Sequence, residues 1–231
     1  IEAGADVNMA ANSGGTPLYM AASSGHEAVF KVLIEAGADV NETRDDGRTP
    51  LYIAAENGHD VVVKALIEAG ADVNKADKDG DTPLYIAAQE GHESVVNSLI
   101  EAGADINMAT DDGRTPLYSA AREGHEAVVK ALVASGANMS IKASDSQTPL
   151  YNAAWKGHLP VIKVLIEACA ELNEALDDGR TPIYRAASLG YELIVKALIE
   201  AGADVNKADN DGVTPLYIAA ENGHDVVVKA L

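Results

Sequence analysis

The chain has 231 residues, of which 47% are hydrophobic and 23% are charged. Asp and Glu (36) outnumber Lys and Arg (17), and the resulting net charge of −19 argues against binding to the phosphate backbone of a nucleic acid. No apolar run approaches the roughly 18 residues that a membrane-spanning helix requires. The single cysteine, Cys169, excludes an internal disulfide and fits a reducing, intracellular and cytoplasmic location.

The sequence repeats itself with a fixed period. The tetrapeptide Thr-Pro-Leu-Tyr, once written Thr-Pro-Ile-Tyr, recurs every 33 residues. Such a period predicts stacked supersecondary units without a single central core. We therefore predict one continuous array over residues 1–231, with partial units at both ends. Its units begin at Thr16, Thr49, Thr82, Thr115, Thr148, Thr181 and Thr214.

The unit that begins at Thr49 predicts two short helices. Thr49 is a good N-cap, and Pro50 suits the first helical position because its missing N–H would have no partner there. Gly58 favours a left-handed end for this helix, and a second helix is expected from His59 to Gly70. A polar turn at residues 77–81 then leads to the next Thr-Pro.

Neither helix exceeds about three turns, so each is marginal in isolation and must bury its apolar face against a neighbouring unit. In five units the second helix places an acid four residues before a lysine, a spacing that predicts an ion pair on the solvent side. The predicted pairs are Glu27–Lys31, Asp60–Lys64, Glu126–Lys130, Glu192–Lys196 and Asp225–Lys229. The predicted core face of the second helix carries Val62, Val63, Leu66 and Ile67.

The unit resembles the ankyrin repeat, whose consensus contains Thr-Pro-Leu-His, an Ala-Ala pair, Gly-His and Gly-Ala-Asp-Val-Asn. The resemblance covers the whole chain and implies an all-α solenoid of paired antiparallel helices with projecting turns. It also implies a non-catalytic function in binding proteins. One departure is systematic, because Tyr replaces the family's His in every unit. We expect the turns to be satisfied differently here, with the phenol reaching the adjacent turn. The tyrosines are Tyr19, Tyr52, Tyr85, Tyr118, Tyr151, Tyr184 and Tyr217.

The residues predict no metal site, cofactor or catalytic centre. Six histidines follow a glycine at the start of second helices, and equivalent residues of stacked units lie about 10 Å apart. Ligands of one zinc must lie about 2 Å from the metal, so the histidines are predicted to be structural. Residues 77–81 are similar to the start of a calcium loop, but the closing acid is replaced by Ala88. No nucleophile, base and orienting group recur together.

Differences between the units point to the binding surface. In the family, the turn tips and the two residues after Ala-Ala line the concave face that binds partners. The most individual surface of this chain lies in units four to six, around the only tryptophan, Trp155. Trp and Arg are frequent interface hot spots, although Trp155 could instead pack on its neighbours. The candidate partner-binding residues are Arg114, Arg122, Glu123, Lys142, Gln147, Asn152, Trp155, Lys156, Arg180, Arg185 and Leu189.

The expected partner is a protein or peptide, partly basic because the chain is acidic. The alternative is a spring-like segment of a much longer array that mainly stacks on itself. Neither end resembles a polar capping repeat. If Ile1 followed Leu231 directly, the two ends would together form a continuous repeat sequence. This predicts head-to-tail self-association, and a natural N-terminus could lie beyond Ile1.

Residues 137–147 are predicted to be the weakest part of the stack. Ser146 replaces a turn glycine, and Cys169 replaces a glycine at a helix end, where an L-residue costs about 1–2 kcal/mol. Pro160 stands early enough in its helix to be tolerated.

Overall fold

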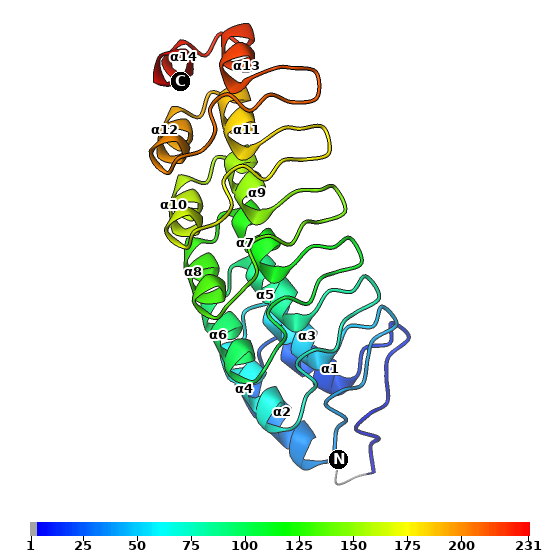
Figure 1. Ribbon diagram of the computed structural model, residues 1–231. Coiled ribbons are helices and arrows are strands. Elements are labelled where there is room, and N and C mark those ends of the chain that lie inside the picture. The colour runs from blue at the N-terminus through cyan, green and yellow to red at the C-terminus, as the bar shows by residue number, and fades with distance from the viewer. Residues whose placement is uncertain (1–3) are drawn as a thin grey trace. The chain divides into compact units, whose positions relative to one another are not determined.

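The computed structural model describes residues 4–231, which form two compact units. The first unit ends at Asp111, and the second runs from Asp112 to Leu231. Every regular element in the described part of the chain is a helix (Figure 1). The predicted all-α fold of paired helices is confirmed. The prediction of one continuous array over residues 1–231 stays a prediction.

In each of these two compact units, the first and second helices of successive repeats alternate along the chain. The first unit contains α1 (Pro17–Ser23), α2 (Glu27–Glu35), α3 (Pro50–Glu56), α4 (Asp60–Glu68), α5 (Pro83–Glu90) and α6 (Glu93–Glu101). The second unit contains α7 (Pro116–Glu123), α8 (Glu126–Ala134), α9 (Pro149–Lys156), α10 (Leu159–Glu167), α11 (Pro182–Ser188), α12 (Glu192–Glu200), α13 (Pro215–Glu221) and α14 (Asp225–Ala230).

The first helices begin as predicted. In α9 the hydroxyl of Thr148 accepts a hydrogen bond from the backbone N–H of Tyr151 at 3.2 Å, and Pro149 is the first helical residue. The helix ends at Gly157, whose φ of 84° lies in the left-handed region that glycine tolerates. The same threonine cap occurs in all seven first helices.

The second helices bury one face and expose the other. In α8, Val128, Val129 and Leu132 are buried, while Glu126 and Lys130 form an ion pair of 2.6 Å on the exposed side. All five predicted acid–lysine pairs are present, with N–O distances between 2.5 and 2.9 Å.

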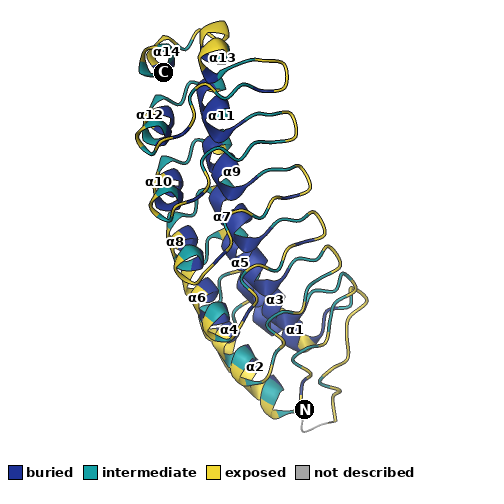
Figure 2. Ribbon diagram, viewed as in Figure 1, coloured by how far each residue is buried: buried dark blue, intermediate teal, exposed yellow. Residues whose placement is uncertain are grey.

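Within each unit, first helices pack on first helices and second helices on second helices (Figure 1). The core lies between these two layers, where the Ala-Ala pairs of α1, α3, α5, α7, α9 and α11 have almost no exposed surface. Figure 2 shows the first helices from α3 to α11 buried along most of their length, whereas α13 and the outer side of the second helices carry exposed residues. The small alanines allow the close approach of neighbouring first helices.

The turns between repeats project to one side within each unit (Figure 1). Neighbouring turns are joined by backbone hydrogen bonds, such as those from Ser144 N–H to Asp112 O (2.8 Å) and from Asn210 N–H to Asp178 O (2.9 Å). The asparagine of the Asp-Val-Asn motif, which follows the second helix, adds a hydrogen bond between consecutive repeats. Asn41 Oδ1, for example, accepts a hydrogen bond from Asp72 N–H at 2.8 Å.

Ser146 and Cys169 are the non-glycine residues with positive φ in the described part of the chain, both at 62°. The expected left-handed conformation of Cys169 is therefore confirmed, and Ser146 adopts the same conformation in place of a turn glycine. In the same part of the chain, no helix is long and apolar enough to cross a membrane.

Candidate partner-binding face

All eleven residues predicted to bind a partner lie in the second unit. Most of them stand on α7, α9 and α11 or on the turns that precede these helices. The four side chains that meet most closely are Tyr151, Trp155, Lys156 and Arg185, which we call the Trp155 cluster.

The Trp155 cluster joins α9 to α11. Trp155 stands in the last turn of α9 and is half-buried. The ammonium nitrogen of Lys156 lies 4.9 Å from the centroid of its ring, and the guanidinium carbon of Arg185 lies 5.6 Å from it. Both cations are thus within the about 6 Å at which a positive charge is attracted to an aromatic face.

Tyr151 anchors Arg185 in this cluster. Arg185 Nε donates a hydrogen bond to the Tyr151 phenol oxygen at 3.0 Å, which holds the guanidinium beside α9. Tyr151 is almost completely buried, and burial raises the pKa of its phenol although the charge of Arg185 opposes the shift. The phenol therefore stays neutral at physiological pH and acts as a fixed acceptor.

Ion pairs engage three of the other candidate residues, namely Arg122, Glu123 and Lys142. Arg122 Nη1 lies 3.5 Å from Glu123 Oε1 in the last turn of α7. Lys142 Nζ lies 2.6 Å from Glu174 Oε1, and it also donates to the carbonyl of Ala175 at 3.2 Å. These pairs are about one-third to two-fifths exposed, so solvent screens them and a partner could exchange with them at little cost.

The arginines of the turn tips hold the turns together. Arg180 lies 3.5 Å from Asp178 in its own turn and 3.8 Å from Asp209 in the next. Arg114 lies 3.6 Å from Asp112. In the first unit Arg48 has the same role as Arg180, with Asp77 of the next turn 3.4 Å away.

Among the uncharged candidates other than Trp155, Asn152 differs from Gln147 and Leu189 in its burial. Leu189 is 37% exposed and Gln147 is partly exposed, so both remain accessible. Asn152 has no exposed surface, and its Nδ2 donates to the carbonyl of Thr148 at 3.2 Å. The prediction that Asn152 contacts a partner is wrong for this conformation, because its side chain points between first helices rather than outward.

The tyrosines partly follow the prediction that their phenols reach the adjacent turn. Tyr118 lies 3.4 Å from Asp145 of the next turn, and Tyr19 accepts a hydrogen bond from Arg44 at 3.5 Å. Tyr151 is bonded instead to Arg185 on the next first helix. The phenol of Tyr52 is buried without a hydrogen-bond partner, beneath the guanidinium of Arg48 at 4.8 Å from the ring centroid.

The structural role predicted for the histidines is confirmed for His59, His92, His158 and His224. His158 Nε2 lies 3.0 Å from the carbonyl oxygen of Arg122, and His92 Nε2 lies 2.9 Å from that of Glu56. Each such bond joins the start of a second helix to the end of the first helix in the preceding repeat. Over residues 4–231, no group of three or more His, Cys, Asp and Glu side chains is arranged to hold a metal ion.

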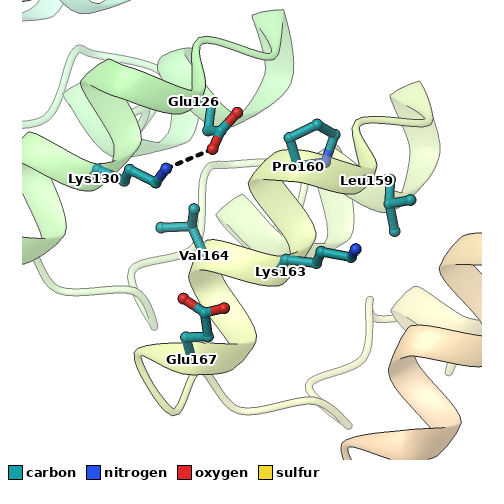
Figure 3. A pocket seen from close by; sticks show the side chains of 7 residues that line it. All are labelled: Glu126, Lys130, Leu159, Pro160, Lys163, Val164 and Glu167. Atoms are coloured by element: carbon teal, nitrogen blue, oxygen red, sulfur yellow. Dashed lines mark hydrogen bonds and ion pairs between the residues drawn. The ribbon is translucent and has the colours of Figure 1, made fainter.

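Shallow cavities on the second helices were not predicted. Figure 3 shows a cavity of about 270 Å³ between α8 and α10, where Lys163 faces outward and has no ion-pair partner in the described part of the chain. Lys163 has no acid four residues before it, because Leu159 occupies the position that is Asp or Glu in the other repeats. A second cavity, of about 250 Å³, is more apolar and is lined by Leu159, Tyr191 and Leu193.

The charge of the chain is distributed unevenly. The first unit has 20 acids and 6 Lys and Arg (net −14), and the second has 16 acids and 11 Lys and Arg (net −5). The contrast is sharper on the first helices. In α7, α9, α11 and α13 the charged residues are Arg122, Glu123, Lys156, Arg185 and Glu221, whereas in α1, α3 and α5 they are Glu56 and Glu90.

Comparison with known proteins identifies the family. A comparison with curated protein sequences gave no match. Among solved structures, the human ASB11 ankyrin repeat domain is similar to this chain with 28% identity and a TM-score of 0.85, over 94% of this chain and 98% of that one. The family model described as "Ankyrin repeats (3 copies)" matches residues 1–77, 30–110, 62–145, 84–175, 129–209 and 150–231. The chain therefore belongs to the ankyrin-repeat family.

Proposed function

We propose that this chain is an intracellular scaffold that binds a protein or peptide partner on the first-helix face of its second unit, with Trp155 at the centre. Ankyrin repeats are generally protein–protein interaction scaffolds, and their fold is a known non-enzymatic one. The observation that supports the location is the Trp155 cluster, where the only tryptophan of the chain is partly exposed beside two cations without acidic partners among the described residues.

The physical basis is the energy that a partner gains on covering this cluster. A tryptophan ring buries a large apolar area on binding, and Trp and Arg are the residues that most often dominate interfaces. The exposed Leu189 and the partly exposed Arg122 and Gln147 would supply the rim. The acidic remainder of the molecule favours a partner that also carries basic segments.

Replacing Trp155 with Ala tests this proposal. Partner capture from the source cell, quantified for the wild type and for Trp155→Ala, should fall by tenfold or more, because truncation of a hot spot costs about 2 kcal/mol or more. Leu193→Ala is the matched control, since Leu193 is 63% exposed and lies on a second helix of the same unit. Equal capture by Trp155→Ala and wild type would refute the location.

A second candidate function is self-stacking, and one observation favours it. In the last repeat Leu216 and Tyr217 are 46% and 58% exposed, whereas the equivalent Ile183 and Tyr184 of the preceding repeat are 0% and 4% exposed. An adjoining repeat covers apolar surface of this kind, whether it belongs to the same chain or, as in this candidate function, to a second copy stacked head to tail. Light scattering should then show concentration-dependent association that Tyr217→Glu abolishes. A monomer at millimolar concentration would exclude this candidate.

A further inference from the structure

Lys156 and Arg185 differ from most cations of the second unit. The lysines at the ends of acid–lysine pairs, the tip arginines and Lys142 all have acidic partners. Lys156 and Arg185 have none in the described part of the chain, although acids are more numerous than bases in this unit. Lys163 and Lys207 of this unit also lack an acidic partner among the described residues, but the two cations that lie on the ring of Trp155 are Lys156 and Arg185.

The geometry of Arg185 leaves its two terminal guanidinium nitrogens available to a partner. Its Nε is used by the phenol of Tyr151, and no described residue accepts a hydrogen bond from its two terminal nitrogens. A guanidinium held by Nε keeps a planar pair of donors whose spacing matches the two oxygens of a carboxylate. In α7 and α9 the equivalent positions are Ser119 and Asn152, which are buried, so the charge at Arg185 is specific to α11.

We propose that Arg185 and Lys156, placed on the ring of Trp155, bind a carboxylate side chain of the partner. This inference rests on the proposed function and names the chemistry that its central site recognises: an Asp- or Glu-bearing peptide segment. Arg185 supplies the paired hydrogen bonds, Lys156 adds a second positive charge, and Trp155 covers the aliphatic stem of the acidic side chain. The partner is then of mixed charge, with an acidic segment at this cluster and basic segments facing the acidic remainder.

The net negative charge of the second unit affects how strongly this cluster binds a carboxylate. Charges separated by more than the Debye length, about 8 Å at physiological salt, are largely screened, so the net charge of −5 on the unit mainly slows the approach of an acidic segment. Asp178, which contributes to the electrostatic environment of Tyr151, is paired with Arg180 at 3.5 Å and is therefore partly neutralised.

Trp155 fluorescence tests the proposal directly, because the chain has no other tryptophan. The probes are capped oligoglutamate, oligoglutamine and oligolysine peptides of equal length. Oligoglutamate should shift the emission of Trp155 saturably, and oligoglutamine should not. Arg185→Gln and Lys156→Gln should each weaken oligoglutamate binding about tenfold, which is the usual effect of removing a charge-assisted hydrogen bond. Arg185→Lys, which keeps the charge but loses the planar fork, should have an intermediate effect.

Lys163→Gln is the matched control, because Lys163 is also unpaired and lies on α10, a second helix of the same unit. It should leave the affinity for oligoglutamate within about twofold of wild type, as expected for a screened, distant charge. The proposal fails if oligoglutamate gives no saturable change, if oligolysine binds better, or if Lys163→Gln weakens binding as much as Arg185→Gln. Any of these results leaves the capture experiment with Trp155→Ala to decide the proposed function by itself.

Discussion

Cys169 shows at the scale of one residue how a repeat accommodates a local departure. It stands where other repeats place Gly136 and Gly202, and it adopts the same left-handed conformation, with φ of 62°. A Cβ added at Gly136 or Gly202 would meet no atom within 4 Å. The cost of Cys169 is therefore conformational, from the contact of its own Cβ with the backbone, and does not arise from crowding by neighbours.

Cys169→Gly should stabilise the protein by about 1 kcal/mol, because glycine adopts this conformation without strain. Urea denaturation of the wild type and the variant measures the difference. Gly202→Ala is the reverse control and should destabilise by a similar amount. A variant Cys169→Gly that is no more stable than wild type would contradict the conformational explanation.

Asp209 shows how a turn carboxylate contributes to stability. Its Oδ1 accepts hydrogen bonds from the backbone N–H groups of Val213 at 2.9 Å and Asp211 at 3.0 Å. The bond from Val213 is the main cause that lowers the pKa of the Asp209 carboxyl, and burial acts in the opposite direction. A lowered folded-state pKa means that the ionised group stabilises the fold above its unfolded pKa of about 4.

Asp209→Asn should therefore destabilise the protein at pH 7, and the difference from wild type should shrink as the pH falls below about 4. Urea denaturation at neutral and acidic pH measures this dependence. Asp211→Asn is the control, because Asp211 is exposed and its carboxylate accepts no hydrogen bond from the described residues. A pH-independent loss of stability in Asp209→Asn would contradict the assignment.

At the scale of one element, the first helix depends on its threonine cap. The cap and the buried tyrosine act together, since Thr148 accepts the N–H of Tyr151, whose ring then fills the space between neighbouring first helices. Propensity contributes little to a helix of this length, so correct starting geometry and burial decide whether it forms.

Thr148→Ala should destabilise the protein by about 1 kcal/mol, the usual cost of a lost N-cap. Thr148→Ser keeps the hydroxyl and should recover most of this loss. Chemical denaturation of the three proteins checks the prediction. Equal destabilisation by Ala and Ser would show that the methyl group of Thr148, and not its hydrogen bond, is important.

The elements also show which features of the candidate site could be predicted. The position of Trp155, two residues beyond Ala153 and in the last turn of α9, follows from the repeat pattern and is as expected. The bond of Arg185 to Tyr151 could not be predicted, because it joins residues 34 apart in sequence and depends on the spacing of α9 and α11. The burial of Asn152 has the same cause, since the neighbouring first helix covers it.

At the scale of the whole molecule, the stack is not equally well joined along its length. In the second unit, backbone hydrogen bonds link the turn at 110–114 to that at 143–147, and the turn at 176–180 to that at 209–213. No such bond joins the described turns at 143–147 and 176–180. Ser146 stands in the first of these turns, at a position where Gly179 of the next turn allows a close approach to Asn210.

Amides of residues 137–147 should therefore exchange with solvent faster than those of the equivalent segments 71–81 and 203–213. Local opening is easiest where few hydrogen bonds must break, so hydrogen exchange measured by mass spectrometry tests the prediction. Ser146→Gly should restore part of the protection. Uniform exchange across the three segments would contradict it.

The sequence by itself determined the repeat, its two helices, their caps and the exposed acid–lysine pairs, because these features depend on residues within about four positions of each other. It also indicated which repeats differ from the others, and so where a binding surface should be sought. Only the tertiary structure decided which of those residues are accessible, which cations lack an acidic partner and which side chains meet between repeats. The physical reason is that these properties arise from the packing of one repeat on the next, which joins residues about 33 positions apart and has no local signal in the sequence.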